Sequence, residues 1–235
     1  MDPVAPPSRR RRWRLVRALV ITALLVTIGP LLALELGYQV EIARIPERPP
    51  DPPPSLPPLV VRSLGVQLFD TPDPRMTPIY PWTPFIGLAR FYLGARPHLI
   101  PEELAARQVM RSAGRPQPPT KLQRLIEVAA LATWISRHLS AREAISVALS
   151  QAHFAPDVVG IAAAARRFFD KSLEELDAGE IAALIAGSAG PSMYPDRPER
   201  LRAPRDALLR KLHDHGLIDE PTMQAAMERD VRRFK

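Results

Sequence analysis

The amino terminus joins a dense block of arginines to a long apolar stretch. The segment "RRRRWRLVRALVITALLVTIGPLLALELGY" is apolar over roughly 20 residues and holds no charge between Arg17 and Glu35. A helix of about that length spans the hydrocarbon core of a bilayer. The sequence therefore predicts a transmembrane helix over residues 15–38, preceded by a basic tail over residues 1–14.

A cleaved signal peptide is the alternative interpretation of this stretch. The apolar run is longer than a usual signal core, and no clear small-x-small site precedes Tyr38, so an uncleaved anchor is favoured. The arginines at 9–12 favour the cytoplasmic side, while Trp13 and Tyr38 suit the two membrane interfaces. Either way, the rest of the chain is expected outside the cytoplasmic membrane.

Charge and cysteine content exclude several classes of function. The formal net charge is +7, but the six Arg and one Asp of residues 1–17 account for +5 of it. A nucleic-acid-binding face needs basic residues gathered in the folded part, so no nucleic-acid partner is expected. Cys is absent, which excludes disulfides, zinc thiolate sites and thiol nucleophiles.

Proline dominates the segment after the apolar stretch. "IPERPPDPPPSLPP" favours an extended polyproline conformation, so residues 39–58 are predicted to be a stiff linker and residues 59–235 the folded domain. "LVVRSLGVQLF" (59–69) is compatible with a strand, and the turn-rich residues after it are predicted to be irregular. Aromatic side chains in this region suit a membrane interface: Trp82, Phe85, Phe91 and Tyr92.

From Pro101 onward the pattern is helical, and the fold class is mostly α. "PEELAARQVMRS" and "TKLQRLIEVAALATWISRHL" have helical starts and spacing. Capping residues predict four further helix starts. They are Ser140 with Glu143, Asp157 before "VVGIAAAARRFF", Asp177 with Glu180, and Asp219.

Residues 137–227 resemble the C-terminal half of the family 51 glycosyltransferase domain, the peptidoglycan transglycosylases. The matching segments occur in the family's order: "RHLSAREAI", "GIAAAARRFFDK", "LDAGEIAALIAG", "PSMYP" and "RDALLRKLHDHGLID". The resemblance implies a lysozyme-like α-helical domain that acts in cell-wall glycan-strand assembly. Glu180 is expected to support its helix and not to be catalytic.

Upstream, the resemblance implies a set of substrate-binding cations. "PFIGLARFYL" puts Arg90 at a family Arg position, and "ELAARQVMRS" puts Arg107 at a family Lys position. "KLQRLIE" resembles the family motif Arg-Lys-x-x-Glu, with Arg124 and Glu127 at its first and last places and Lys121 beside them. This cluster would neutralise the departing pyrophosphate. The alternative without a substrate-binding role is a set of ordinary surface charges, with Arg124 and Glu127 pairing along one helix.

The family's catalytic Glu, the general base in its first motif, has no counterpart here. The best match is "QLFDTPDPRM", which puts Phe69 at the Glu and Asp70 at the following Asp. Asp70 is therefore the candidate base and Glu127 the second catalytic carboxylate. Other family acidic or amide positions hold Ser146, Ser150 and Ala162.

Three interpretations follow. The leading one is a non-catalytic relative that binds glycan strands, lipid-linked precursor or cell-wall synthesis proteins. The second is an active glycosyltransferase that uses Asp70, Glu102 or Glu103 as base, and the third is a membrane-anchored assembly protein without a glycan role. No cofactor and no metal site are expected, although an active form could use a divalent metal. The expected location is the bacterial inner membrane, single-pass, with the C-terminal domain periplasmic or extracytoplasmic.

Overall fold

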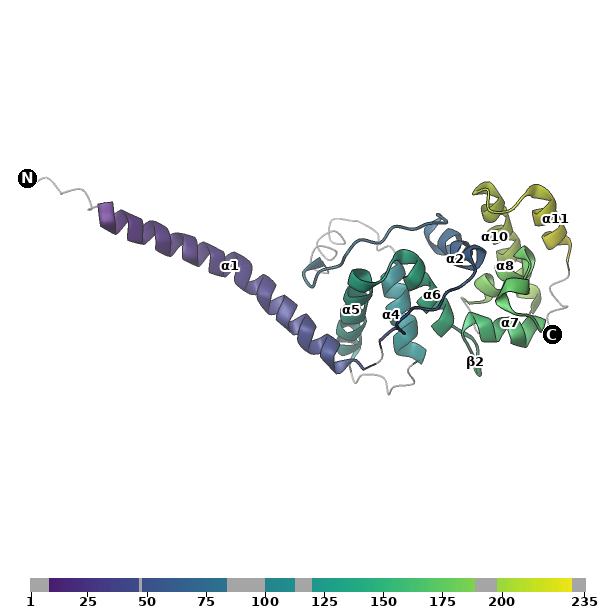
Figure 1. Cartoon of the computed structure of the whole chain (residues 1–235), viewed down its shortest axis with the longest axis horizontal. Helices are drawn as coiled ribbons and strands as arrows, with labels where there is room; N and C mark the ends of the chain where they lie inside the picture. The colour runs from purple at the N-terminus through teal and green to yellow at the C-terminus, as the bar shows by residue number, and fades with distance from the viewer. Residues whose placement is uncertain (1–8, 47, 84–99, 113–119, 189–197, 230–235) are drawn as a thin grey trace, which may run out of the picture.

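The computed structural model describes residues 9–46, 48–83, 100–112, 120–188 and 198–229. Within them the chain is mostly α-helical, with short 3₁₀ turns η1 and η2 and one two-stranded antiparallel hairpin (Figure 1). The elements are α1 (Arg9–Arg44), α2 (Pro58–Phe69), α4 (Pro101–Ser112), α5 (Lys121–His138), α6 (Ala141–Gln151), β1 (His153–Ala155), β2 (Val158–Val159), α7 (Ile161–Phe169), η1 (Leu173–Glu175), α8 (Ala178–Gly187), η2 (Pro198–Leu201), α10 (Arg202–Asp214) and α11 (Glu220–Glu228).

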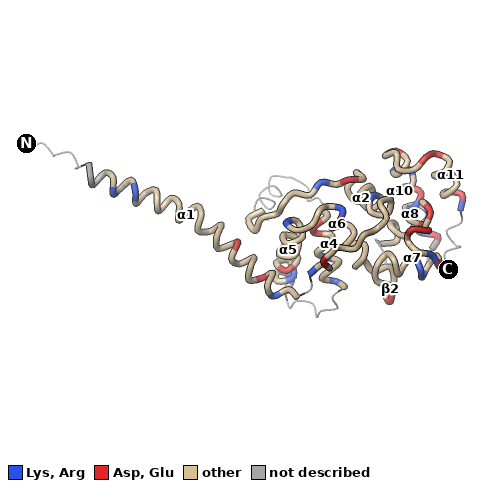
Figure 2. Tube along the Cα trace, viewed as in Figure 1, with Lys and Arg blue, Asp and Glu red and all other residues tan. Residues whose placement is uncertain are grey.

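Helix α1 has 36 residues, which gives a length of about 54 Å. It projects away from the remaining helices (Figure 1), and a long stretch without charge separates its basic start from its first acidic residue (Figure 2). In the described part of the chain it is the one helix long and apolar enough to cross a membrane, by length and composition.

The last turns of α1 belong to the folded domain. Tyr38 and Ile42 of α1, with Ile45 directly after the helix, are buried in an apolar cluster with α4, α5 and α6. Residues 39–44, assigned to the linker from the sequence, thus continue the helix in the structure. The proline-rich segment after them leads to α2, and both Ile45 and Pro49 within it are buried. This part of the chain therefore lies against the domain.

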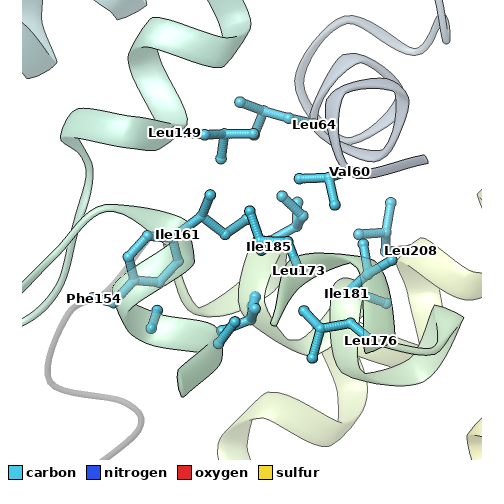
Figure 3. Close-up of a cluster of buried hydrophobic side chains, with 14 of the residues drawn as sticks. Val60, Leu64, Leu149, Phe154, Ile161, Leu173, Leu176, Ile181, Ile185 and Leu208 are labelled. Carbon is cyan, nitrogen blue, oxygen red and sulfur yellow. The ribbon is translucent and has the colours of Figure 1, made fainter. Parts of the chain in front are cut away.

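A second apolar cluster holds α2, α6, α7, α8 and α10 together. Figure 3 shows side chains from these elements converging. Its members include Val60, Leu64, Leu149, Phe154, Ile161, Ile181, Ile185 and Leu208. The strand expected over residues 59–69 is wrong, because this segment is helix α2. The adjacent valines favoured a strand, but Pro58 at the first helical position and burial of Val60, Val61 and Leu64 on one helix face decide the outcome.

Most predicted helix starts are confirmed. Ser140 with Glu143 and Asp177 with Glu180 form capping boxes, and the Asp219 side chain accepts a hydrogen bond from the backbone N–H of Thr222. Both carboxylate oxygens of Glu180 also accept from the Lys171 Nζ, at 2.7 and 2.9 Å. Glu180 thus supports the start of α8, as expected.

The predicted cap at Asp157 is wrong. Val158 and Val159 pair with β1 as strand β2, so α7 begins only at Ile161. The cause is Gly160, whose φ of +88° breaks the helical path and whose N–H donates to the carbonyl of Ala152 at 2.8 Å.

Candidate functional site

The candidate base Asp70 lies directly after α2 in the left-handed conformation, with φ of 54°. Its carboxylate is exposed and accepts a hydrogen bond from the Lys211 Nζ of α10 at 2.8 Å. That hydrogen bond lowers the pKa of Asp70. A general base works best with a pKa near the operating pH, so this partner makes Asp70 a poorer base.

The loop of residues 70–75 is held in place at further points. Asp73 accepts from the Arg142 Nη2 of α6 at 2.6 Å, which lowers the Asp73 pKa, and lies 3.7 Å from the Arg62 guanidinium of α2. The loop also folds back on its own helix: a Cβ at Gly65 would lie only 2.7 Å from the Thr71 carbonyl oxygen. Both acidic side chains of the loop therefore serve as ion-pair partners between helices.

Glu127 lies elsewhere in the molecule. It is buried in α5, accepts a hydrogen bond from the Gln123 amide at 3.3 Å, and lines a pocket of about 540 Å³ at the end of α1. The pocket is formed by Glu41, Arg44, Ile45, Thr120, Leu122, Gln123, Ile126 and Glu127. Because Asp70 contacts α10 and α5 lies on the α1 side of the domain (Figure 1), the two candidate carboxylates do not share one site.

The predicted cations in the described part of the chain lie on two helices, α4 and α5. The Arg107 guanidinium on α4 donates from its Nε to the Glu103 carboxylate one turn earlier, at 3.0 Å. This is the arrangement expected of an ordinary surface charge. Lys121 is the exposed first residue of α5, and Arg124 is exposed one turn later. Arg90 falls outside the described residues.

One carboxylate has properties that the sequence did not signal. Glu102, in the first turn of α4, is only 3% exposed, and its Oε2 has no hydrogen-bond partner among the described residues. Burial raises the pKa of Glu102 above its usual value. The surroundings of Glu102 therefore shift its pKa toward neutrality, whereas those of Asp70 lower the pKa of Asp70.

A metal would need a cluster of hard or nitrogen ligands. Among the described residues no group of three or more His, Asp or Glu side chains is placed to hold one.

Comparison with known proteins shows what the helical part of the chain is similar to. Residues 105–213 match the family model for transglycosylases. This stretch is similar to transglycosylase domains. It runs from α4 to α10, and its helical, lysozyme-like fold is the one expected from the sequence.

The curated relatives are penicillin-binding proteins. The chain is 33% identical over 108 residues to penicillin-binding protein 1A of Rickettsia typhi, and 33% identical over 112 residues to that of Rickettsia felis. These alignments cover 45% and 47% of this chain but only 14% of each relative. A crystal structure of penicillin-binding protein 1A from Haemophilus influenzae is 19% identical, covers 56% of this chain and 16% of that chain, and has a TM-score of 0.35. That structural likeness is too weak to carry an argument.

Proposed function

We propose that this chain is a membrane-anchored, non-catalytic relative of the peptidoglycan glycosyltransferases. It would act in glycan-strand assembly by binding lipid-linked precursor, glycan strands or a cell-wall synthesis protein. The transglycosylase match supports the glycan role. The observation that carries the loss of catalysis is the state of the 70–75 loop, whose two carboxylates are both engaged with cations from other helices.

The geometry of α1 supports a retained anchor. Glu35, at the end of the uncharged stretch, accepts two hydrogen bonds from the Arg137 guanidinium of α5, at 2.8 and 3.0 Å. Removal of α1 up to Tyr38 as a signal peptide would leave Arg137 without this partner. We therefore expect the intact mass of the membrane-extracted protein to include the amino-terminal residues. Its amino terminus would lie in the cytoplasm and its domain in the periplasm or its extracytoplasmic equivalent.

The test is glycan-chain formation by the full-length protein in detergent with fluorescent lipid-linked disaccharide-pentapeptide. An active polymerase domain serves as the positive control, and precursor binding is measured in parallel. We expect no polymer from the wild type, with precursor or glycan strands still bound. Absence of both polymer and binding would favour an assembly protein without a glycan role, and polymer would contradict the proposal.

A specific observation favours one second candidate, an active glycosyltransferase with a displaced base. Glu102 is a buried carboxylate whose raised pKa suits proton abstraction near neutral pH better than that of Asp70. The polymerisation assay therefore includes Glu102→Gln and Asp70→Ala. Polymer lost in Glu102→Gln but kept in Asp70→Ala would establish this candidate.

A further inference from the structure

A predominantly apolar pocket of about 590 Å³ lies between α1 and the segment that follows the 70–75 loop. One wall consists of Ile28, Leu31 and Leu32 of α1, and the other of Pro78, Tyr80 and Trp82. The Tyr80 and Trp82 rings stack with centroids 4.8 Å apart and an interplanar angle of 6°. This second wall is therefore a flat aromatic surface that faces the apolar part of α1.

The Glu35–Arg137 ion pair closes one end of the pocket and fixes its two walls together. Arg137 donates to Glu35 from both terminal nitrogens, and its Nε donates to the carbonyl of Ile79 at 3.2 Å. The guanidinium also lies 4.8 Å from the ring centroid of Tyr38 and 5.2 Å from that of Tyr80. One side chain of α5 thus connects the transmembrane helix to the segment that carries the aromatic wall.

Position along α1 sets the depth of the pocket in a bilayer. The uncharged residues 18–34 number 17, a length of about 26 Å at the helical rise, close to the roughly 30 Å of a hydrocarbon core. Glu35 then lies at the boundary on the domain side. Ile28, seven residues earlier, lies about 10 Å deeper, within the roughly 15 Å depth of that leaflet.

At that depth the medium around the pocket is lipid hydrocarbon. Glu35 neutralises the Arg137 guanidinium at 2.8 Å, so the ion pair carries no net charge to recruit an anionic headgroup or a pyrophosphate. The apolar walls would then bind the ligand, and they would select it by its hydrocarbon chain and not by its headgroup. This favours a bulk phospholipid over a pyrophosphate-linked precursor.

We propose that this pocket binds one acyl chain of a phospholipid from the leaflet on the domain side. The Glu35–Arg137 pair keeps the pocket formed by holding Tyr80 and Trp82 against α1. The proposal rests on the membrane anchor of the proposed function and is independent of the glycan role.

The first experiment measures the location of Trp82. Trp13→Phe and Trp134→Phe substitutions leave Trp82 as the sole tryptophan of the full-length protein, which is placed in bilayers of phosphatidylcholine brominated at mid-chain. We expect the brominated chains to quench Trp82 emission and aqueous acrylamide to leave it largely unquenched. Strong acrylamide quenching with no quenching by bromine would place the wall in water and overturn the proposal.

The second experiment separates a bound chain from general immersion. Spin-labelled phosphatidylcholine should give a motionally restricted spectral component with the wild type. Leu31→Trp, which fills the pocket, should lose that component, whereas Leu25→Trp, on the same helix outside the pocket, should keep it. Arg137→Gln should also lose it, and Arg142→Gln, whose partner is Asp73, should not. Equal restricted components in both tryptophan variants would contradict a chain bound in this pocket.

Failure of this inference is distinguishable from failure of the proposed function. A protein that resists carbonate extraction and keeps its amino terminus by mass, yet shows no restricted lipid, refutes only the pocket. A protein that has lost α1 by mass refutes the anchor itself.

Discussion

Arg205 should be one of the most stabilising charged residues of the domain. Its side chain is 1% exposed, and it donates to the carbonyls of Met227 and Arg229 at 3.1 and 3.0 Å and to the Asp206 carboxylate at 2.8 Å. The guanidinium of α10 thereby holds the carboxyl-terminal end of α11. Arg205→Met keeps most of the volume but leaves two carbonyls and one carboxylate without their donor.

The magnitude follows from those lost bonds. A hydrogen bond to a charged group contributes about 1.5–3 kcal/mol, and removal of one partner of a buried ion pair costs about 3–5 kcal/mol. Because the Met side chain recovers some apolar burial and Asp206 can reach water, we expect a loss of about 3 kcal/mol for Arg205→Met. For a domain of this size that corresponds to a melting temperature lower by about 6–12 °C.

The assay is thermal unfolding of the full-length protein in detergent, with Arg202→Met as the matched control. Arg202 is 69% exposed and lies 3.9 Å from the same Asp206, and a surface pair of this kind contributes about 0–1 kcal/mol. Hydrogen exchange gives a second readout, because Arg205→Met should raise exchange chiefly in α11. A melting temperature for Arg205→Met no lower than that of the control, or unchanged exchange in α11, would refute the reasoning.

Two further predictions concern pH and backbone conformation. Burial raises the Glu102 pKa above 4.5. Glu102 therefore contributes fully to the stability of the folded protein below the pKa it has in the unfolded chain. This contribution is lost as the pH rises through the pKa that Glu102 has in the folded protein. Glu102→Gln should therefore gain melting temperature relative to wild type as the pH rises above 4.5, measured by thermal unfolding over a series of pH values. Gly160→Ala should cost about 1–3 kcal/mol, measured by chemical denaturation, because its Cβ would lie 2.7 Å from the Ser150 carbonyl at φ of +88°. Gly216→Ala, at φ of +67° with open space around it, should cost less stability than Gly160→Ala. An equal cost would show that the left-handed backbone conformation, and not the close contact of the Cβ, determines the loss.

Local signals in the sequence predicted most of the helical part. Capping boxes and apolar spacing depend on residues within a few positions of each other, and the helix starts at Ser140, Asp177 and Asp219 are confirmed. The two wrong assignments, at residues 59–69 and at Asp157, have tertiary causes. Valine-rich segments are compatible with strand or helix until their packing partners are known: one became a helix on α8 and α10, and the other a strand on β1.

The candidate site was less predictable, because its decisive contacts join residues far apart in the sequence. Asp70 and Lys211 are separated by 141 positions, and Asp73 and Arg142 by 69. No local pattern indicates that a carboxylate will find such a cation. The burial of Glu102 was equally hidden, since a Glu in the first turn of a helix usually faces solvent. The family resemblance indicated which residue types stand at the expected site positions, but it did not indicate which residues those side chains contact.

The ion pairs of the 70–75 loop bear directly on catalysis. A general base works best with a pKa near the operating pH, whereas the hydrogen bonds from Lys211 and Arg142 lower the pKa values of Asp70 and Asp73. Freeing Asp70 by Lys211→Met would raise its pKa toward the ordinary value but leave an exposed side chain on the α10 side of the domain, away from α5. We therefore expect Lys211→Met to create no polymerase activity. Any glycan polymer formed by this chain must then depend on another carboxylate, and the buried Glu102 is the one to replace first.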